Sequence, residues 1–102
     1  MSERIALCKT GDVAEGTALK VEAGDLTLAV FNLNGHFFAM DDACSHGPGS
    51  LSEGYVEGDE IECDFHNGRF KIATGEVAAP PCMAPQKVYP VTVADGMLFV
   101  EA

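Results

Sequence analysis

Residues 19–40 read LKVEAGDLTLAVFNLNGHFFAM, and apolar side chains recur in this stretch at about every second position. That period is typical of a β-strand with one buried face. Two turn signals interrupt the pattern, one at Gly24-Asp25 and one at Asn34-Gly35. An Asn-Gly pair between two apolar runs is the strongest short-range indication of a hairpin. The stretch therefore predicts successive antiparallel strands.

Two later segments predict hairpins as well. YVEGDEIEC indicates two short strands around Glu57-Gly58-Asp59, and the closing runs KVYPVTV and MLFVEA flank Ala94-Asp95-Gly96. No segment sustains a helical period over about 11 residues. Short strands joined by glycine-rich turns are typical of an all-β sandwich. Because the chain has only 102 residues, we expect a single domain covering residues 1–102.

The charge of the chain narrows the classes of partner. Sixteen acidic and six basic residues give a formal net charge of −10. This excludes a nucleic-acid surface, which needs basic patches. An acidic surface can steer a basic partner, or it can serve solubility alone. The candidates for an acidic docking surface are Asp41, Asp42, Asp59, Glu60 and Glu62.

The N-terminal residues and the cysteines bear on location. MSERIALCKTGDV has no basic region followed by an apolar run, and no apolar stretch approaches the length of a membrane span. We therefore expect no secretory signal, no membrane partner and a cytoplasmic location. In that compartment the cysteines should bind metal or remain thiols rather than form disulfides. They are Cys8, Cys44, Cys63 and Cys82.

The composition changes over residues 42–70, where two short motifs combine cysteine with histidine. The first motif places Cys44 two residues before His46, and the second places Cys63 three residues before His66. Zinc accepts two cysteines and two histidines, but its usual spacing pairs like with like. A [2Fe–2S] cluster can instead hold two thiolates on one iron and two imidazoles on the other. Both metal centres remain open on spacing alone.

At these motifs the chain resembles a known family. C-S-H-G and C-D-F-H-N-G match the Rieske pattern C-x-H…C-x-x-H. Over essentially the whole chain, the sequence is most similar to the small Rieske-type ferredoxins of bacterial aromatic-ring dioxygenase systems. The resemblance implies an all-β, Rieske-like antiparallel β-sandwich with a small, loop-rich cluster-binding insertion at about residues 42–70. It also implies a proline loop at about residues 78–86, AAPPCMAPQ, that shields the cluster; the alternative is an ordinary rigid connection.

The same resemblance implies one [2Fe–2S] cluster per chain and assigns its ligands and neighbours. The ligands would be Cys44, His46, Cys63 and His66. The residues beside the cluster would be Gly47, Pro48, Gly49, Phe65, Gly68 and Pro81. The Gly-Pro-Gly turn would present backbone N–H groups to the bridging sulfides, or it would simply let the loop bend.

The combination of two thiolate and two imidazole ligands determines the charge of the cluster. With two thiolates and two neutral imidazoles the oxidised cluster is neutral, whereas four thiolates would make it a dianion. Adding an electron to a neutral centre is easier, so Rieske potentials lie at about −150 to +300 mV, against about −400 mV for plant-type ferredoxins.

Two pairs of positions indicate where in that range this chain falls. Rieske proteins of respiratory and photosynthetic cytochrome complexes carry an additional disulfide between the loops, and the matching positions here are Gly49 and Phe65. Those relatives also place a serine and a tyrosine that donate hydrogen bonds to sulfur, where this chain has Gly68 and Phe70. Fewer donors stabilise the reduced state less.

The function that this resemblance implies is electron transfer without catalysis. Both irons would have a full set of ligands, and His36 lies beside a turn, where we interpret it as a strand residue. The implied partners are a flavin-dependent NADH reductase, as donor, and a Rieske non-haem iron terminal oxygenase, as acceptor. Two alternatives remain: a Rieske-like small subunit of another oxidoreductase, such as nitrite reductase, and a zinc-stabilised interaction module.

The missing sulfur donors predict a low reduction potential. We expect a midpoint of about −150 mV, at the lower end of the Rieske range. A potentiometric titration of the anaerobic protein measures it. A clearly positive midpoint would contradict the argument from Gly68 and Phe70.

Overall fold

The computed structural model describes residues 4–43, 50–63, 68–79 and 86–101. Within these ranges the chain forms eleven strands in three antiparallel sheets, with two single-turn 3-10 helices, η1 (Thr10–Asp12) and η2 (Leu51–Glu53). None of the described helices is long and apolar enough to cross a bilayer. The antiparallel, nearly all-strand fold confirms the predicted class.

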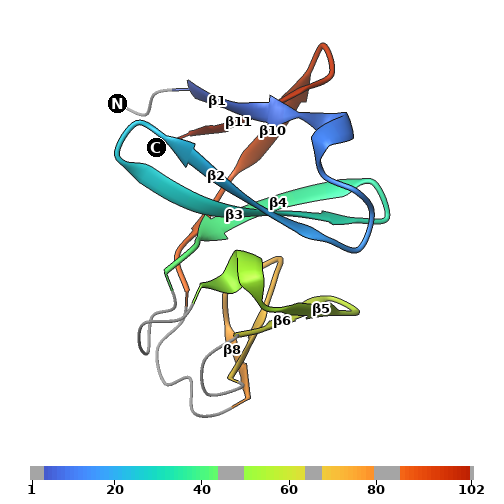
Figure 1. The fold of residues 1–102 in the computed structure, drawn as a ribbon, viewed down its shortest axis with the longest axis vertical. Helices are drawn as coiled ribbons and strands as arrows, with labels where there is room; N and C mark the ends of the chain where they lie inside the picture. Colours follow the sequence, from blue (N-terminus) through green and yellow to red (C-terminus); the bar gives the residue numbers. More distant parts are fainter. Residues whose placement is uncertain (1–3, 44–49, 64–67, 80–85, 102) are drawn as a thin grey trace.

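Three sheets make up the molecule (Figure 1). The first has the order β1-β11-β10, with strands Arg4–Lys9, Met97–Glu101 and Val91–Ala94. The second has the order β2-β3-β4-β9, with strands Ala18–Ala23, Leu26–Leu33, His36–Asp41 and Val88–Tyr89. The third has the order β5-β6-β7-β8, with strands Tyr55–Glu57, Glu60–Glu62, Arg69–Lys71 and Val77–Ala79.

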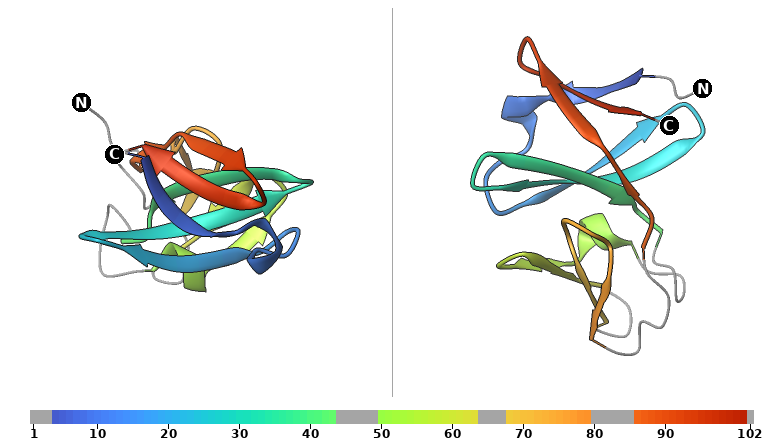
Figure 2. Two further views of the ribbon diagram at one scale, coloured as in Figure 1. Left: turned by 90° about the horizontal axis from the view of Figure 1, so that it is seen from above. Right: turned by 180° about the vertical axis from the view of Figure 1, so that it is seen from behind.

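The second sheet is the middle layer, lying between the other two in Figures 1 and 2. Its strand β3 is buried on both faces. Leu28 and Val30 pack into the core shared with the first sheet, which also contains Leu98. Ala29 and Phe31 pack into the core shared with the third sheet. Because side chains alternate across a strand, one continuous apolar run supplies both cores.

Two-residue turns close the predicted hairpins. Asn34 and Gly35 have φ of 54° and 85° between β3 and β4, and Asp95 and Gly96 have φ of 51° and 75° between β10 and β11. Positive φ at both central residues matches the right-handed twist of the flanking strands. The hairpins predicted from Asn34-Gly35 and from Ala94-Asp95-Gly96 are therefore confirmed.

The run KVYPVTV forms two strands rather than one. Pro90 separates β9, which pairs with β4, from β10, which pairs with β11 in another sheet. Proline has no N–H to donate to a ladder and is therefore excluded from the interior of a paired strand. The break lets the chain pass from the middle layer to the first sheet.

The region between β4 and β9 contains more regular structure than its glycine-rich sequence suggests. Four three-residue strands, β5 to β8, form a sheet of their own. Its inward side chains, including Ile61 and Phe70, are fully buried against the middle layer. The limits proposed for the insertion and for the proline loop stay predictions.

Phe31 tests the packing between the middle and third sheets. It is fully buried in their shared core, so Phe31→Ala should lower the free energy of unfolding by about 3–5 kcal/mol. The control is Val93→Ala, since Val93 is 53% exposed on β10; we expect a change within about 0.5 kcal/mol. Equal losses in denaturant titrations of the two variants would contradict this assignment of the core.

Candidate metal centre

Two of the residues predicted for the metal centre lie within the described part of the chain. Cys63, one of the four predicted ligands, follows β6 and is fully buried in the same core as Leu51 and Phe70. Gly68, predicted to lie beside the cluster, is also buried. The others lie outside the described residues: Cys44, His46, Gly47, Pro48, Gly49, Phe65, His66 and Pro81. Their roles remain predictions.

The ends of the second motif are held together by the backbone. The N–H of Cys63 donates to the carbonyl of Gly68 at 2.7 Å. Beyond this pair, β6 and β7 continue as an antiparallel ladder, with Glu62 opposite Arg69. The predicted ligand Cys63 therefore lies directly before residues 64–67, and the third sheet fixes the residues on both sides of that segment.

The ends of the first motif are held by a buried carboxylate. Ala43 and Ser50 form an isolated antiparallel bridge on either side of residues 44–49. Asp42, only 3% exposed, accepts hydrogen bonds from the Ser50 hydroxyl at 2.7 Å and from the Ser52 N–H at 2.8 Å. The Leu51 N–H donates to the Asp42 carbonyl at 2.9 Å. Asp42 is therefore not part of an acidic docking surface; the signal that could have revealed its role is the pair of serines a few residues later.

A buried glutamine ties the chain just after residues 80–85 to the residues just before the first motif. Gln86 follows residues 80–85 and is 4% exposed. Its side-chain amide donates to the carbonyls of Asp41 and Ala43, each at 2.6 Å. Sequence reasoning missed this residue, because nothing in a lone glutamine indicates which distant carbonyls it will reach.

These observations suit a centre held by short loops. A fully buried cysteine begins one loop, and the flanking residues of each of the two motif segments are hydrogen-bonded to each other. Within the described ranges alone, no three His, Cys, Asp or Glu side chains gather as metal ligands.

Comparison with known proteins gives the family. Residues 3–90 match the model of the Rieske [2Fe-2S] domain. The chain belongs to the Rieske family. The ferredoxin component of a p-cumate 2,3-dioxygenase system from Pseudomonas putida is 48% identical, covering 99% of this chain and 87% of that protein.

Solved structures agree with this placement. A ferredoxin of Sphingomonas yanoikuyae B1 superposes with a TM-score of 0.94 at 40% identity, covering 98% of this chain and 99% of the other. A chain from the complex of reduced oxygenase and oxidized ferredoxin in carbazole 1,9a-dioxygenase gives 0.89 at 41% identity, covering 95% of this chain and 91% of that one. This Rieske protein accordingly holds one [2Fe–2S] cluster and is an electron carrier rather than an enzyme.

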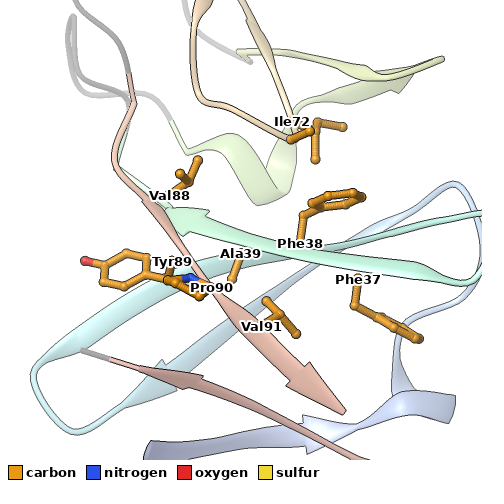
Figure 3. A pocket seen from close by; sticks show the side chains of 9 residues that line it. Phe37, Phe38, Ala39, Ile72, Val88, Tyr89, Pro90 and Val91 are labelled. Carbon is orange, nitrogen blue, oxygen red and sulfur yellow. The ribbon is translucent and has the colours of Figure 1, made fainter. Parts of the chain in front are cut away.

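One groove of the Rieske protein is lined by apolar side chains and by Tyr89, with no charged side chain among them. It has a volume of about 390 Å³ and is lined by residues of β4 and β9, the start of β10 and the residues that follow β7. Figure 3 shows Ile72 of the third layer facing Phe38 and Val88 of the middle layer. The walls are otherwise apolar apart from Tyr89, whose hydroxyl points away from the groove.

The outer face of the third sheet concentrates charge. Arg69 forms ion pairs with Glu57 at 3.1 Å, Glu62 at 3.3 Å and Glu60 at 3.7 Å. These carboxylates, Glu57 foremost, raise the pKa of Arg69. Exposed ion pairs of this kind add little stability. Lys71 lies opposite Glu60 on the same face, so three carboxylates face two cations there and the face keeps a small negative balance.

The Tyr89 hydroxyl donates a hydrogen bond to the Asp41 carboxylate at 2.7 Å. Burial, together with the hydrogen bond and the negative charge of Asp41, raises the pKa of Tyr89 to about 12. The folded state thus favours the neutral phenol. The resulting stabilisation is fully present below the ordinary phenol pKa of about 10 and is lost as the pH rises toward 12.

This shift predicts an alkaline loss of stability. Between about pH 10 and pH 12, the free energy of unfolding should fall by about 2 kcal/mol more in the wild type than in Tyr89→Phe. Since the chain has only two tyrosines, a Tyr55→Phe background isolates the Tyr89 phenol for ultraviolet titration. Parallel pH profiles for wild type and Tyr89→Phe would show that the prediction is wrong.

Proposed function

We propose that this Rieske protein is the one-electron carrier of an aromatic-ring-hydroxylating dioxygenase system. It takes electrons from a flavin-dependent NADH reductase and delivers them to a terminal Rieske non-haem iron oxygenase. The observation that carries the proposal is similarity over nearly the whole of this chain: ferredoxins align with 98–99% of it at 40–48% identity. In the carbazole system, a ferredoxin similar to this one is seen in complex with its oxygenase.

The proposed ligands are Cys44 and Cys63, through sulfur, and His46 and His66, through ring nitrogen. When bound, a [2Fe–2S] cluster supplies a one-electron couple. The chain itself contributes the placement of its ligands: Cys63 is fixed in a buried core. Binding requires deprotonated thiols and neutral imidazoles.

The negative charge of the chain is the property that would guide docking. With a formal net charge of −10, the protein would be attracted to basic surfaces on its reductase and oxygenase. Such attraction accelerates encounter and is screened by salt. We also propose a cytoplasmic location, where cysteines stay reduced and available to iron.

Ligand substitution tests the proposed cluster site. Cys63→Ser, His46→Ala and His66→Ala should each reduce bound iron and acid-labile sulfide by about tenfold or more. The matched controls are Cys8→Ser and His36→Ala, because Cys8 is a half-buried thiol on β1 and His36 is exposed at the start of β4. Both controls should retain the cluster. Full loading of Cys63→Ser or His66→Ala would contradict the ligand assignment.

Reconstitution tests the proposed role. With NADH, a flavin reductase and a terminal ring-hydroxylating oxygenase, we expect product formation to depend on this protein and to saturate with its concentration. The rate at low carrier concentration should fall several-fold as salt rises from low to physiological ionic strength, because docking is electrostatically steered. Chromatography of the hydroxylated product measures it. Equal product without the carrier would overturn the proposal.

A further inference from the structure

Gln86 is buried where three segments of the chain meet. Its side-chain nitrogen, Nε2, donates to two backbone carbonyls, those of Asp41 and Ala43. An amide nitrogen has two hydrogens, so the geometry uses the full donor capacity of the side chain. The two carbonyls are 43 and 45 residues away along the chain, so the contact joins distant segments.

The backbone of Gln86 makes the third connection. Its N–H donates to the carbonyl of Gly75, in the turn between β7 and β8, at 2.7 Å. Gly75 has φ of +78°, and a Cβ there would collide with the Gln86 carbonyl oxygen. Glycine therefore permits the close approach that brings Gln86 against the third sheet. We call residues 80–85 the proline segment. Gln86, directly after it, thus links the end of this segment to the third sheet and to the strand that leads into the first motif.

The carbonyls that Gln86 holds are those on either side of Asp42. Asp42 in turn fixes Ser50 and Ser52, beyond the other end of the first motif. The two buried polar residues act in series: Gln86 holds the residues before the motif, and Asp42 ties those residues to the ones after it. Neither contact involves a proposed cluster ligand, so both would act on the ligands only through backbone position.

We propose that Gln86 is a positioning residue for the cluster, coupling the proline segment to the loop that bears Cys44 and His46. The inference rests on the proposed ligand set. Groups outside the ligand shell orient the ligands, and their loss typically weakens metal binding about 10- to 100-fold.

Without the Gln86 amide, the carbonyls of Asp41 and Ala43 each lose a donor. The Asp41 N–H still donates to the Lys87 carbonyl at 3.0 Å. The residue that loses its tie to the chain after the proline segment is therefore Ala43, the last described residue before Cys44.

The test compares two buried amides in the holoprotein. Gln86→Met keeps an unbranched side chain of similar length but removes both donors. The control is Asn32→Leu, since Asn32 on β3 is also buried, donates to the Val13 carbonyl at 2.9 Å and accepts from the Gly35 N–H at 2.9 Å. Thermal unfolding, the rate of iron release to a chelator and the electron paramagnetic resonance spectrum of the reduced cluster are measured for both.

We expect both variants to unfold at lower temperature, whereas only Gln86→Met releases iron about tenfold faster and shifts the resonance spectrum. If Gln86→Met does not fold, Gln86→Asn keeps the amide but shortens the reach, and it should show the same changes to a lesser degree. Iron release and spectra that match those of Asn32→Leu would overturn the inference and leave the carrier function intact. A wild-type protein that binds no iron–sulfur cluster would overturn both.

Discussion

Burial of the middle sheet on both faces is the constraint on which the rest of the structure depends. Strand β3 sends Leu28 and Val30 toward the first sheet and Phe31 toward the third. In the part of the chain that the structure describes, each outer sheet packs into one core, which it shares with this layer. The third sheet, and with it Cys63, is positioned by the same strand that closes the sandwich. Stability and site geometry therefore have a common origin in one apolar strand.

Buried polar side chains then fix the residues that flank the proposed ligand segments. Asp42 and Gln86 are buried polar side chains that form hydrogen bonds with main-chain groups on either side of residues 44–49 and with the Ser50 hydroxyl. Burying such groups is costly unless they are paired, which makes their positions specific. A carrier needs this, because a centre that changes oxidation state repeatedly must keep its ligands in place in both states. A small β scaffold that fixes the ends of the ligand segments meets that requirement in a chain of only 102 residues.

Apolar and charged side chains occupy different parts of the molecule. The cores are apolar, whereas the outer face of the third sheet collects Glu57, Glu60 and Glu62 around Arg69. These exposed contacts contribute little to folding. In the proposed carrier their effect would be on encounter, since a surface with a negative balance attracts basic partners over a distance set by the ionic strength. Folding and the proposed docking thus draw on different residues of the same sheet.

The sequence by itself determined the β class, the hairpins and the family. Alternation at residues 19–40 follows from side-chain geometry along a strand, the Asn34-Gly35 turn follows from the cost of positive φ, and the cysteine–histidine spacing follows from the ligands that iron accepts. All of these are local. Only the tertiary structure decided that Pro90 divides one apolar run between two sheets, that Asp42 is buried, and that Gln86 reaches Asp41 and Ala43. These features depend on which distant segments meet in the fold. A hydrogen bond between residues more than 40 positions apart produces no periodicity or motif spacing, so it cannot be recognised in the sequence.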